Sequence, residues 1–230
     1  LNLFNDNAYL IVVSVGMTFV LLTGGIDISV ASIVAFTGVF AAFLLEKGWA
    51  AAPVIALTLF IGAFVGFLQG YAVHEFKIAP FLITLAGQFL MRGMCAVVST
   101  ISIPITNDFF KSAALAKISW VTASGSRPKL YYYVFFAIAI VIIAWYILRF
   151  TRFGRAVYAV GSNEQSAQYM GLNVKGVKVG VYAINGFCSA LGGILFSFYT
   201  LAGYSLQNMG MELDAISSAV IGGTLLTGGV

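Results

Sequence analysis

The chain has 230 residues, of which 60% are hydrophobic and only 9% are charged. A water-soluble protein of this length needs more charged side chains to cover its surface, so the composition excludes a soluble globular domain. The net charge of +4 does not indicate nucleic-acid binding, because the cations flank apolar segments and form no dense patch. The composition instead predicts an all-α membrane protein that crosses the bilayer several times.

The apolar segments predict six membrane spans and part of a seventh. A bilayer core accepts about 20 apolar helical residues per span. The first apolar stretch, 8–45, would measure roughly 57 Å as one helix, against a core of about 30 Å, so it must break, and it does so at Thr23–Ser29. The expected spans are Ala8–Leu22, Ile28–Leu45, Val54–Val73, Phe81–Val98, Tyr131–Leu148 and Val177–Leu201, with a partial span at Glu212–Leu226.

Cations around one loop set the expected orientation. Positive charges next to span ends favour the cytoplasmic side. The cations that flank this loop are Arg149, Arg152, Arg155, Lys175 and Lys178. We therefore expect 150–176 in the cytosol and Ser99–Lys129 outside, although the latter carries four cations. Residue 1 is then outside, and 1–230 is expected to be one transmembrane domain without its N- and C-terminal spans.

Cysteine and histidine give no sign of a metal or a cofactor. Cys95 and Cys188 both lie in apolar segments, where small buried hydrophobic residues are expected. His74 has no Cys or His neighbours at ligand spacing and is expected in an interfacial loop. We predict no metal site, no disulfide and no cofactor.

Gly62, Gly66 and Gly70 recur every four residues and so lie on one face of a helix. In a membrane such a face lets a second helix approach closely. We expect a helix-packing surface, and a surface lining the substrate passage is the alternative.

Acidic residues stand at two breaks in the apolar segments. Asp27 follows Gly24 and Gly25, while Glu212 and Asp214 precede the last apolar segment. A carboxylate there either caps the helix that follows or takes part in gating or in the translocation path. The segments 24–29 and 210–215 echo each other and enter the membrane from opposite sides, as the halves of an inverted repeat would.

The cytosolic loop is expected to contain a short capped helix. Ser162-Asn163-Glu164-Gln165 has the pattern of a capping box, with Ser162 as N-cap and Gln165 reaching back. Gly171 is expected to end the helix, which would span Asn163–Met170. The pattern alone leaves open whether the helix has a function or is plain surface.

Three motifs together resemble one family. They are Thr23-Gly-Gly-Ile-Asp-Ile-Ser-Val30, Arg152-Phe-Gly-Arg155 followed by Ala159-Val-Gly-Ser-Asn163, and Glu212-Leu-Asp-Ala-Ile216 followed by Val220-Ile-Gly-Gly-Thr224. Nearly the whole chain resembles the permease subunits of ribose-type bacterial monosaccharide ABC importers. The segments Lys77–Gly87 and Tyr199–Tyr204 are most similar to the galactofuranose transporter permease.

The resemblance implies a permease fold with broken and short helices in the bacterial inner membrane. It implies four partners for this chain: a second permease subunit, identical or different, a cytosolic ABC ATPase, a periplasmic sugar-binding protein and membrane lipid. Ala167 and Gly171 match the Ala-xxx-Gly core of the loop that docks such ATPases, so Ser162, Asn163, Gln165, Ala167 and Gly171 become expected coupling residues. Where the family's loop often begins Glu-Ala-Ala, this chain reads Gln165-Ser166-Ala167.

Other functions fit the sequence less well. A secondary active transporter would share broken helices and inverted repeats, but it would need coupling-ion ligands, and the chain has few acids in its apolar segments. An intramembrane enzyme lacks a catalytic constellation, since the chain contains a single histidine. The sequence has no Gly-x-x-x-x-Gly-Lys loop, so ATP hydrolysis is expected on another chain.

Overall fold

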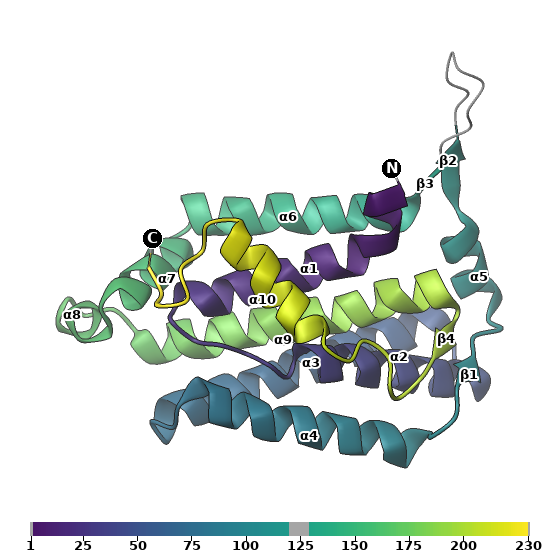
Figure 1. The fold of residues 1–230 in the computed structure, drawn as a ribbon, viewed down its shortest axis with the longest axis horizontal. Helices are drawn as coiled ribbons and strands as arrows, with labels where there is room; N and C mark the ends of the chain where they lie inside the picture. The colour runs from purple at the N-terminus through teal and green to yellow at the C-terminus, as the bar shows by residue number, and fades with distance from the viewer. Residues whose placement is uncertain (1, 120–128, 230) are drawn as a thin grey trace.

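The chain folds into a bundle of long helices, seen in a computed structural model that describes residues 2–119 and 129–229 (Figure 1). The long helices run along the longest axis of the molecule and alternate in direction. They are α1 (Asn2–Leu22), α2 (Val30–Glu46), α3 (Ala51–Glu75), α4 (Pro80–Val98), α6 (Tyr132–Phe150) and α9 (Val174–Thr200). Within the described ranges, five of them are long and apolar enough to cross a membrane, and the sixth, α2, has 17 residues.

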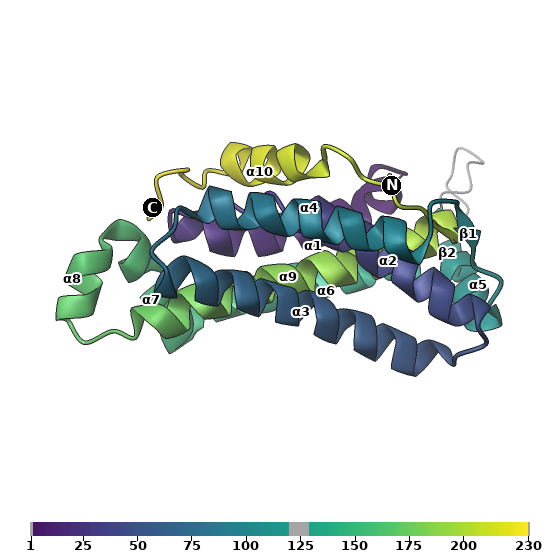
Figure 2. The same ribbon diagram turned by 90° about the horizontal axis from the view of Figure 1, so that it is seen from below.

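The short elements gather at the two ends of the bundle. One end, here called the strand end, holds a small helix and two antiparallel strand pairs: β1 (Ile103–Pro104) with β4 (Ala202–Gly203), and β2 (Lys117–Ser119) with β3 (Lys129–Tyr131), beside α5 (Asp108–Leu115). The opposite end, here called the α8 end, holds α7 (Arg152–Ser162) and α8 (Glu164–Tyr169). The last helix, α10 (Met211–Ile221), lies across one face of the bundle and packs against α1 (Figures 1 and 2).

Helix α9 lies at the centre of the bundle and packs against α1, α2 and α3. Small residues make this possible, because they let helix backbones come close together. Gly62, Gly66 and Gly70 of α3 all face α9, where a Cβ atom on any of them would collide with α9. The expected helix-packing face therefore lies against a helix of the same chain.

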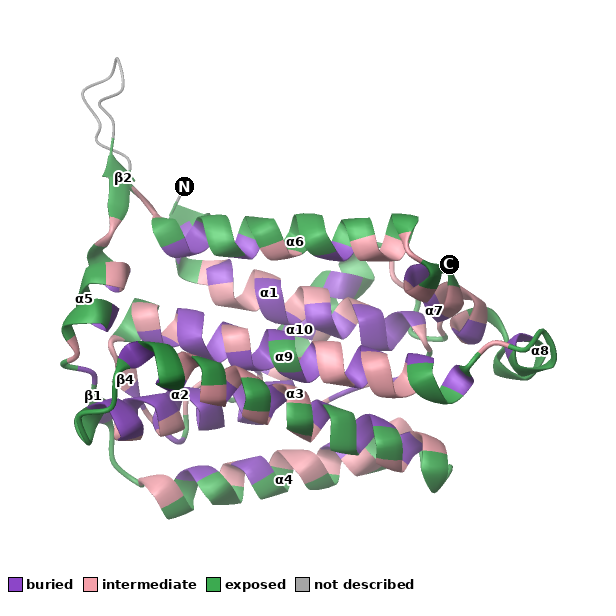
Figure 3. Ribbon diagram, turned by 180° about the vertical axis from the view of Figure 1, so that it is seen from behind, coloured by how far each residue is buried: buried purple, intermediate pink, exposed green. Residues whose placement is uncertain are grey.

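The outward faces of the bundle are apolar. Phe60 of α3, Phe89 of α4 and Phe136 of α6 are exposed over 66%, 70% and 62% of their surfaces. Figure 3 shows exposed residues along the length of α6 and α4. Large apolar side chains on several neighbouring helices mark a surface that faces lipid. The chain is thus an all-α membrane protein that crosses the bilayer several times.

Most of the long helices start and end close to the ends of the expected spans, but α1 begins at Asn2, well before the expected Ala8. Two further differences concern α7 and α10. The sequence pattern missed α7, which is amphipathic and carries too few consecutive apolar residues to be read as a span. The last helix ends at Ile221 and not at Leu226, because Gly223 has a positive φ of 100° and the backbone turns there. Part of the expected outer stretch, 120–128, lies outside the described residues.

Candidate functional site: a buried polar cluster and the helix pair at the α8 end

The break between α1 and α2 is a sharp turn at the α8 end of the bundle. Helix α1 ends at Leu22, and Gly24 adopts a φ of +73°, which glycine reaches without strain. Gly25 lets the chain pass close to α9, since a Cβ atom there would stand 2.6 Å from the hydroxyl of Tyr182. The two glycines thus allow the chain to turn and to bring Asp27 into the centre of the bundle.

Asp27 is fully buried and accepts three hydrogen bonds. Its Oδ1 accepts from the backbone N–H of Ser29 (2.8 Å) and from the hydroxyl of Ser29 (2.6 Å). Its Oδ2 accepts from the side-chain amide of Asn185 in α9, at 2.7 Å. The capping hypothesis needs a correction, because Ser29 occupies the N-cap position of α2 and Asp27 stands two residues earlier. The carboxylate satisfies one N–H at the start of the helix and also reaches across to α9.

Two further helices complete this polar cluster. The side-chain amide of Gln69 in α3 donates to Ser29 Oγ at 3.0 Å. The hydroxyl of Thr84 in α4 donates to the carbonyl of Ile26 at 3.3 Å. The buried polar cluster, defined as Asp27, Ser29, Gln69, Thr84 and Asn185, therefore joins the break to three helices that are distant in the sequence.

A carboxyl group at membrane depth is costly to bury, and the hydrogen bonds of this cluster offset part of that cost. None of the ion pairs among the described residues involves Asp27. The Oδ1 atom of Asn185 is buried and has no hydrogen-bond partner. Sequence reasoning found Asp27 but missed Gln69, Thr84 and Asn185, whose only signal is that each is a polar residue inside an apolar segment.

The acids near α10 lie apart from this cluster. The N-cap of α10 is Gly210, with a φ of +88°, so Asp214 does not precede the helix but lies in its first turn, where it is exposed. Glu212 accepts a long hydrogen bond of 3.4 Å from Gln88 of α4. The expected capping role of Asp214 is therefore wrong. Both acids still stabilise the N-terminal end of α10, because a carboxylate interacts favourably with the positive end of a helix dipole.

The short helix expected in the long loop is α8, but its cap is shifted by one residue. Asn163 is the N-cap, and its Oδ1 accepts from the N–H of Ser166 at 2.8 Å. Ser162 is instead the last residue of α7, where its hydroxyl donates to the carbonyl of Tyr158. The side chain of Gln165 lines a cavity and does not complete a capping box. Ser162 was predicted wrongly as N-cap because α7, which the pattern did not reveal, runs through it.

The C-terminal end of α8 is fixed by Gly171. This residue has a φ of +78°, and the N–H of Leu172 donates to the carbonyl of Ala167 at 3.1 Å. The side chain of Ala167 is buried. Such a left-handed stop ends a helix abruptly. Only four residues, 170–173, separate α8 from α9.

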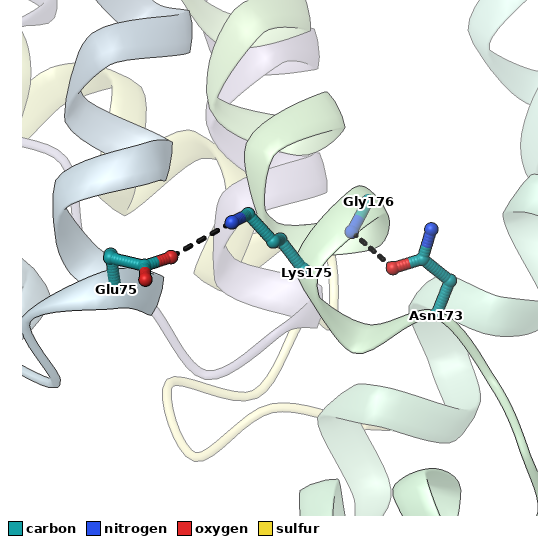
Figure 4. A network of polar contacts seen from close by, with 4 residues as sticks. All are labelled: Glu75, Asn173, Lys175 and Gly176. Carbon is teal, nitrogen blue, oxygen red and sulfur yellow. Dashed lines mark hydrogen bonds and ion pairs between the residues drawn. The ribbon is translucent and has the colours of Figure 1, made fainter.

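Side chains tie α8 and the start of α9 to the bundle. Lys178 of α9 pairs with Glu164 of α8 at 2.7 Å. Figure 4 shows Lys175 of α9 pairing with Glu75 of α3 at 2.8 Å, and Asn173 capping α9 by accepting from Gly176 N–H at 2.9 Å. Exposed ion pairs add little stability; here one of them joins α8 to α9 and the other joins α9 to α3.

One cavity of about 870 Å³ is lined by residues of two predicted sites, the break after α1 and the loop that contains α8. It lies between α8, the α3–α4 connection and the break after α1. From the break it is lined by Thr23 and Gly24, and from the α7–α8 pair by Ser162, Asn163 and Gln165. Its lining includes two cations, Lys77 and Lys178, and the imidazole of His74. The break and the short helix, far apart in the sequence, thus share a polar cavity at one end of the bundle.

Comparison with known proteins identifies the kind of molecule that carries this arrangement. The family model described as "Branched-chain amino acid transport system / permease component" matches residues 1–230. The inner membrane ABC transporter permease protein YjfF of Escherichia coli is 43% identical over 231 residues, covering 100% of this chain and 68% of that protein. The fructose import permease FruG of Bifidobacterium longum is 39% identical, covering 99% and 68%. The ribose import permease RbsC of Haemophilus influenzae is 38% identical, covering 100% and 70%.

No solved structure matches the chain significantly. The family model and the relatives cover the whole described bundle, including both predicted sites. Permease components carry solutes through the membrane and are not enzymes, and the lipid-facing helices agree with that class. The chain therefore belongs to the family of branched-chain amino acid transport system / permease components, and it is a membrane-spanning ABC transporter permease of the bacterial inner membrane.

Proposed function

We propose that this chain is the transmembrane subunit of an ABC importer that passes a monosaccharide through the bacterial inner membrane, powered by a separate ATPase. The observation that carries the proposal is α8, a short helix whose two ends are fixed by Asn163 and Gly171. Such a helix transmits movement better than a loose loop, because little of the movement is lost in bending. The chain itself has no nucleotide-binding loop, so the driving movement comes from a partner.

The buried polar cluster supplies a route by which that movement reaches the membrane interior. Four residues separate α8 from α9, and α9 carries Asn185, whose amide donates a hydrogen bond to Asp27 at the break. A displacement of α8 that shifts α9 along its axis would stretch or break the hydrogen bond between Asn185 and Asp27. We propose that the break between α1 and α2 is the part of the permease that responds to the ATPase.

The proposed orientation puts the α8 end in the cytosol and the strand end in the periplasm. It is supported by the arginines at the end of α6 and the lysines at the start of α9, since cations beside spans favour the cytoplasmic side. In this orientation the ATPase binds at α8, and a sugar-binding protein docks on the strand end. A second permease subunit completes the passage.

A monosaccharide is supported as substrate by the relatives, which are named as permeases for ribose, fructose and D-allose. The segments Lys77–Gly87 and Tyr199–Tyr204 favour galactofuranose within this class. We propose a galactofuranose-like or ribose-like sugar as the substrate.

The test is transport by the reconstituted complex. The full-length permease is placed in vesicles with its neighbouring ATPase and binding protein, and uptake of labelled galactofuranose, ribose and fructose is measured with and without ATP. Uptake of one sugar that needs both ATP and the binding protein supports the proposal. Uptake driven by a proton or sodium gradient in vesicles that lack the ATPase would contradict it and favour a secondary transporter.

A further inference from the structure

A second cavity, of about 470 Å³, lies at the corner between α6 and α7. Its lining residues are Trp145, Leu148, Arg149, Arg155 and Tyr158. It is distinct from the cavity beside α8, because the two share no lining residue. It plays no part in the proposed coupling route.

The corner is built by a sharp turn at Thr151. The hydroxyl of Thr151 donates to the carbonyl of Ile147 at 2.6 Å and accepts from the N–H of Gly154 at 3.1 Å, so it ends α6 and caps α7. Gly154 lies against the last turn of α6, where a Cβ atom would collide with the carbonyl oxygens of Ile147 and Leu148. This close approach places side chains of both helices around one hollow.

The cavity carries positive charge without compensation. Arg149 comes from the last turn of α6 and Arg155 from the first turns of α7. No acidic residue occurs between Lys129 and Glu164 in the sequence, and neither ion pair among the described residues involves these arginines. Two guanidinium groups at one hollow form a site for an anion, and they suit phosphate because each can donate two parallel hydrogen bonds.

The remaining walls of the cavity belong to a membrane interface. Trp145 is exposed over 59% of its surface, on an α6 whose outer face also exposes Ile142 and Ile143. Its ring meets Phe150 edge-on, with centroids 5.3 Å apart. Tryptophan and tyrosine are enriched where lipid headgroups meet the hydrocarbon core. The cations therefore stand where a membrane-spanning helix leaves the bilayer, with an apolar helix face beside them.

We propose that this corner binds the phosphodiester headgroup of an anionic phospholipid. Arg149 and Arg155 contact the phosphate oxygens, Trp145 and Tyr158 flank the glycerol region, and the acyl chains lie along α6. A lipid fits better than a soluble phosphate because the cavity adjoins an exposed apolar face of α6, along which acyl chains can lie. In the orientation proposed above, the site faces the cytoplasmic leaflet, where anionic lipids attract basic clusters.

The experiment is native mass spectrometry of the purified full-length permease in detergent, titrated with phosphatidylglycerol, phosphatidylcholine or glycerol 3-phosphate. We expect selective binding of phosphatidylglycerol. In the double variant Arg149→Gln/Arg155→Gln, its affinity should fall roughly 30-fold, from the contribution of two cations beside an anionic lipid. Trp145→Leu should weaken phosphatidylglycerol and phosphatidylcholine alike.

Arg152→Gln is the matched control, because Arg152 belongs to the same basic turn but does not line the cavity. It should keep the affinity of the unmodified protein. An equal loss in Arg152→Gln would mean that the attraction is diffuse, and it would overturn the site. Equal binding of the two lipids would also overturn it, as would full displacement of phosphatidylglycerol by glycerol 3-phosphate. Because binding is measured without transport, these results are independent of the proposed sugar import.

Discussion

The carbonyl oxygen of Tyr182 in α9 lies so close to Gly66 of α3 that a Cβ atom at Gly66 would collide with it. The contact is reciprocal along the crossing, since a Cβ atom at Gly186 of α9 would collide with the carbonyl of Gly62. The two backbones therefore touch, and the helices cannot take larger residues there without moving apart. The crossing lies beside Asn185, so it also sets the position of the buried polar cluster.

Gly66→Leu should destabilise the folded permease by on the order of 3 kcal/mol, because the obstacle is backbone and cannot swing away. The measurement is thermal unfolding of the purified protein in detergent. Gly93→Leu is the matched control: Gly93 lies in α4 and a Cβ atom there meets nothing within 4 Å. Equal unfolding temperatures for the two variants would show that the α3–α9 crossing does not limit stability.

Asp27→Asn should retain more transport than Asp27→Leu. Asparagine can still accept from Ser29 N–H, and its own amide can donate to the unpartnered Oδ1 of Asn185 once that side chain rotates. Leucine leaves buried donors without acceptors, which costs about 1–3 kcal/mol for each group. Uptake in vesicles and unfolding temperature should be measured together. If both variants fold normally and lose uptake equally, the charge of Asp27 is required and its hydrogen bonds are not.

Asn163→Ala should loosen α8 by about 1 kcal/mol through loss of the N-cap, whereas Ser162→Ala should have little effect. The two residues are adjacent and both exposed, so the pair separates capping from general surface changes. Hydrogen exchange at the amide of Ser166, which the cap binds, is the direct measurement. Faster exchange in Ser162→Ala than in Asn163→Ala would place the cap at Ser162 after all.

Gly171→Val should weaken binding of the ATPase, because a β-branched residue resists the positive φ by about 1–2 kcal/mol and the exit from α8 must change. Gly171→Asn is the rescue variant, since asparagine tolerates this conformation. Co-purification of the ATPase and sugar-stimulated ATP hydrolysis should fall for valine and recover for asparagine. Unchanged ATPase binding and ATP hydrolysis in Gly171→Val would mean that the exit from α8 has no role in coupling to the ATPase.

Single cysteines at Ser112 and Ser162 test the orientation, because Ser112 lies in α5 and Ser162 lies at the α8 end, and both are exposed. In intact cells a membrane-impermeant thiol reagent should label Ser112→Cys, and it should label Ser162→Cys only after lysis. The native Cys95 and Cys188 are buried and give a low background. The opposite labelling pattern would reverse the proposed topology.

The spans could be predicted from sequence because the bilayer imposes a local rule: a helix must present about 20 apolar residues in succession. The break at Gly24 and Gly25 was equally visible, since one helix over 8–45 would be too long. The position of the N-cap of α8 could not be predicted in this way, because Ser162 and Asn163 are both good capping residues. The choice depended on how far α7 continued, and α7 carries no span-like pattern.

The sequence by itself determined the class of this protein, its membrane-spanning segments and the stop at Gly171, because these depend on composition and on the backbone of single residues. Only the tertiary structure decided which polar groups share the membrane interior. Asp27 meets Asn185, 158 residues away, and Ser29 meets Gln69, 40 residues away. Such pairs form where the packing of α3 against α9 places two helix faces in register, and that placement depends on the whole bundle.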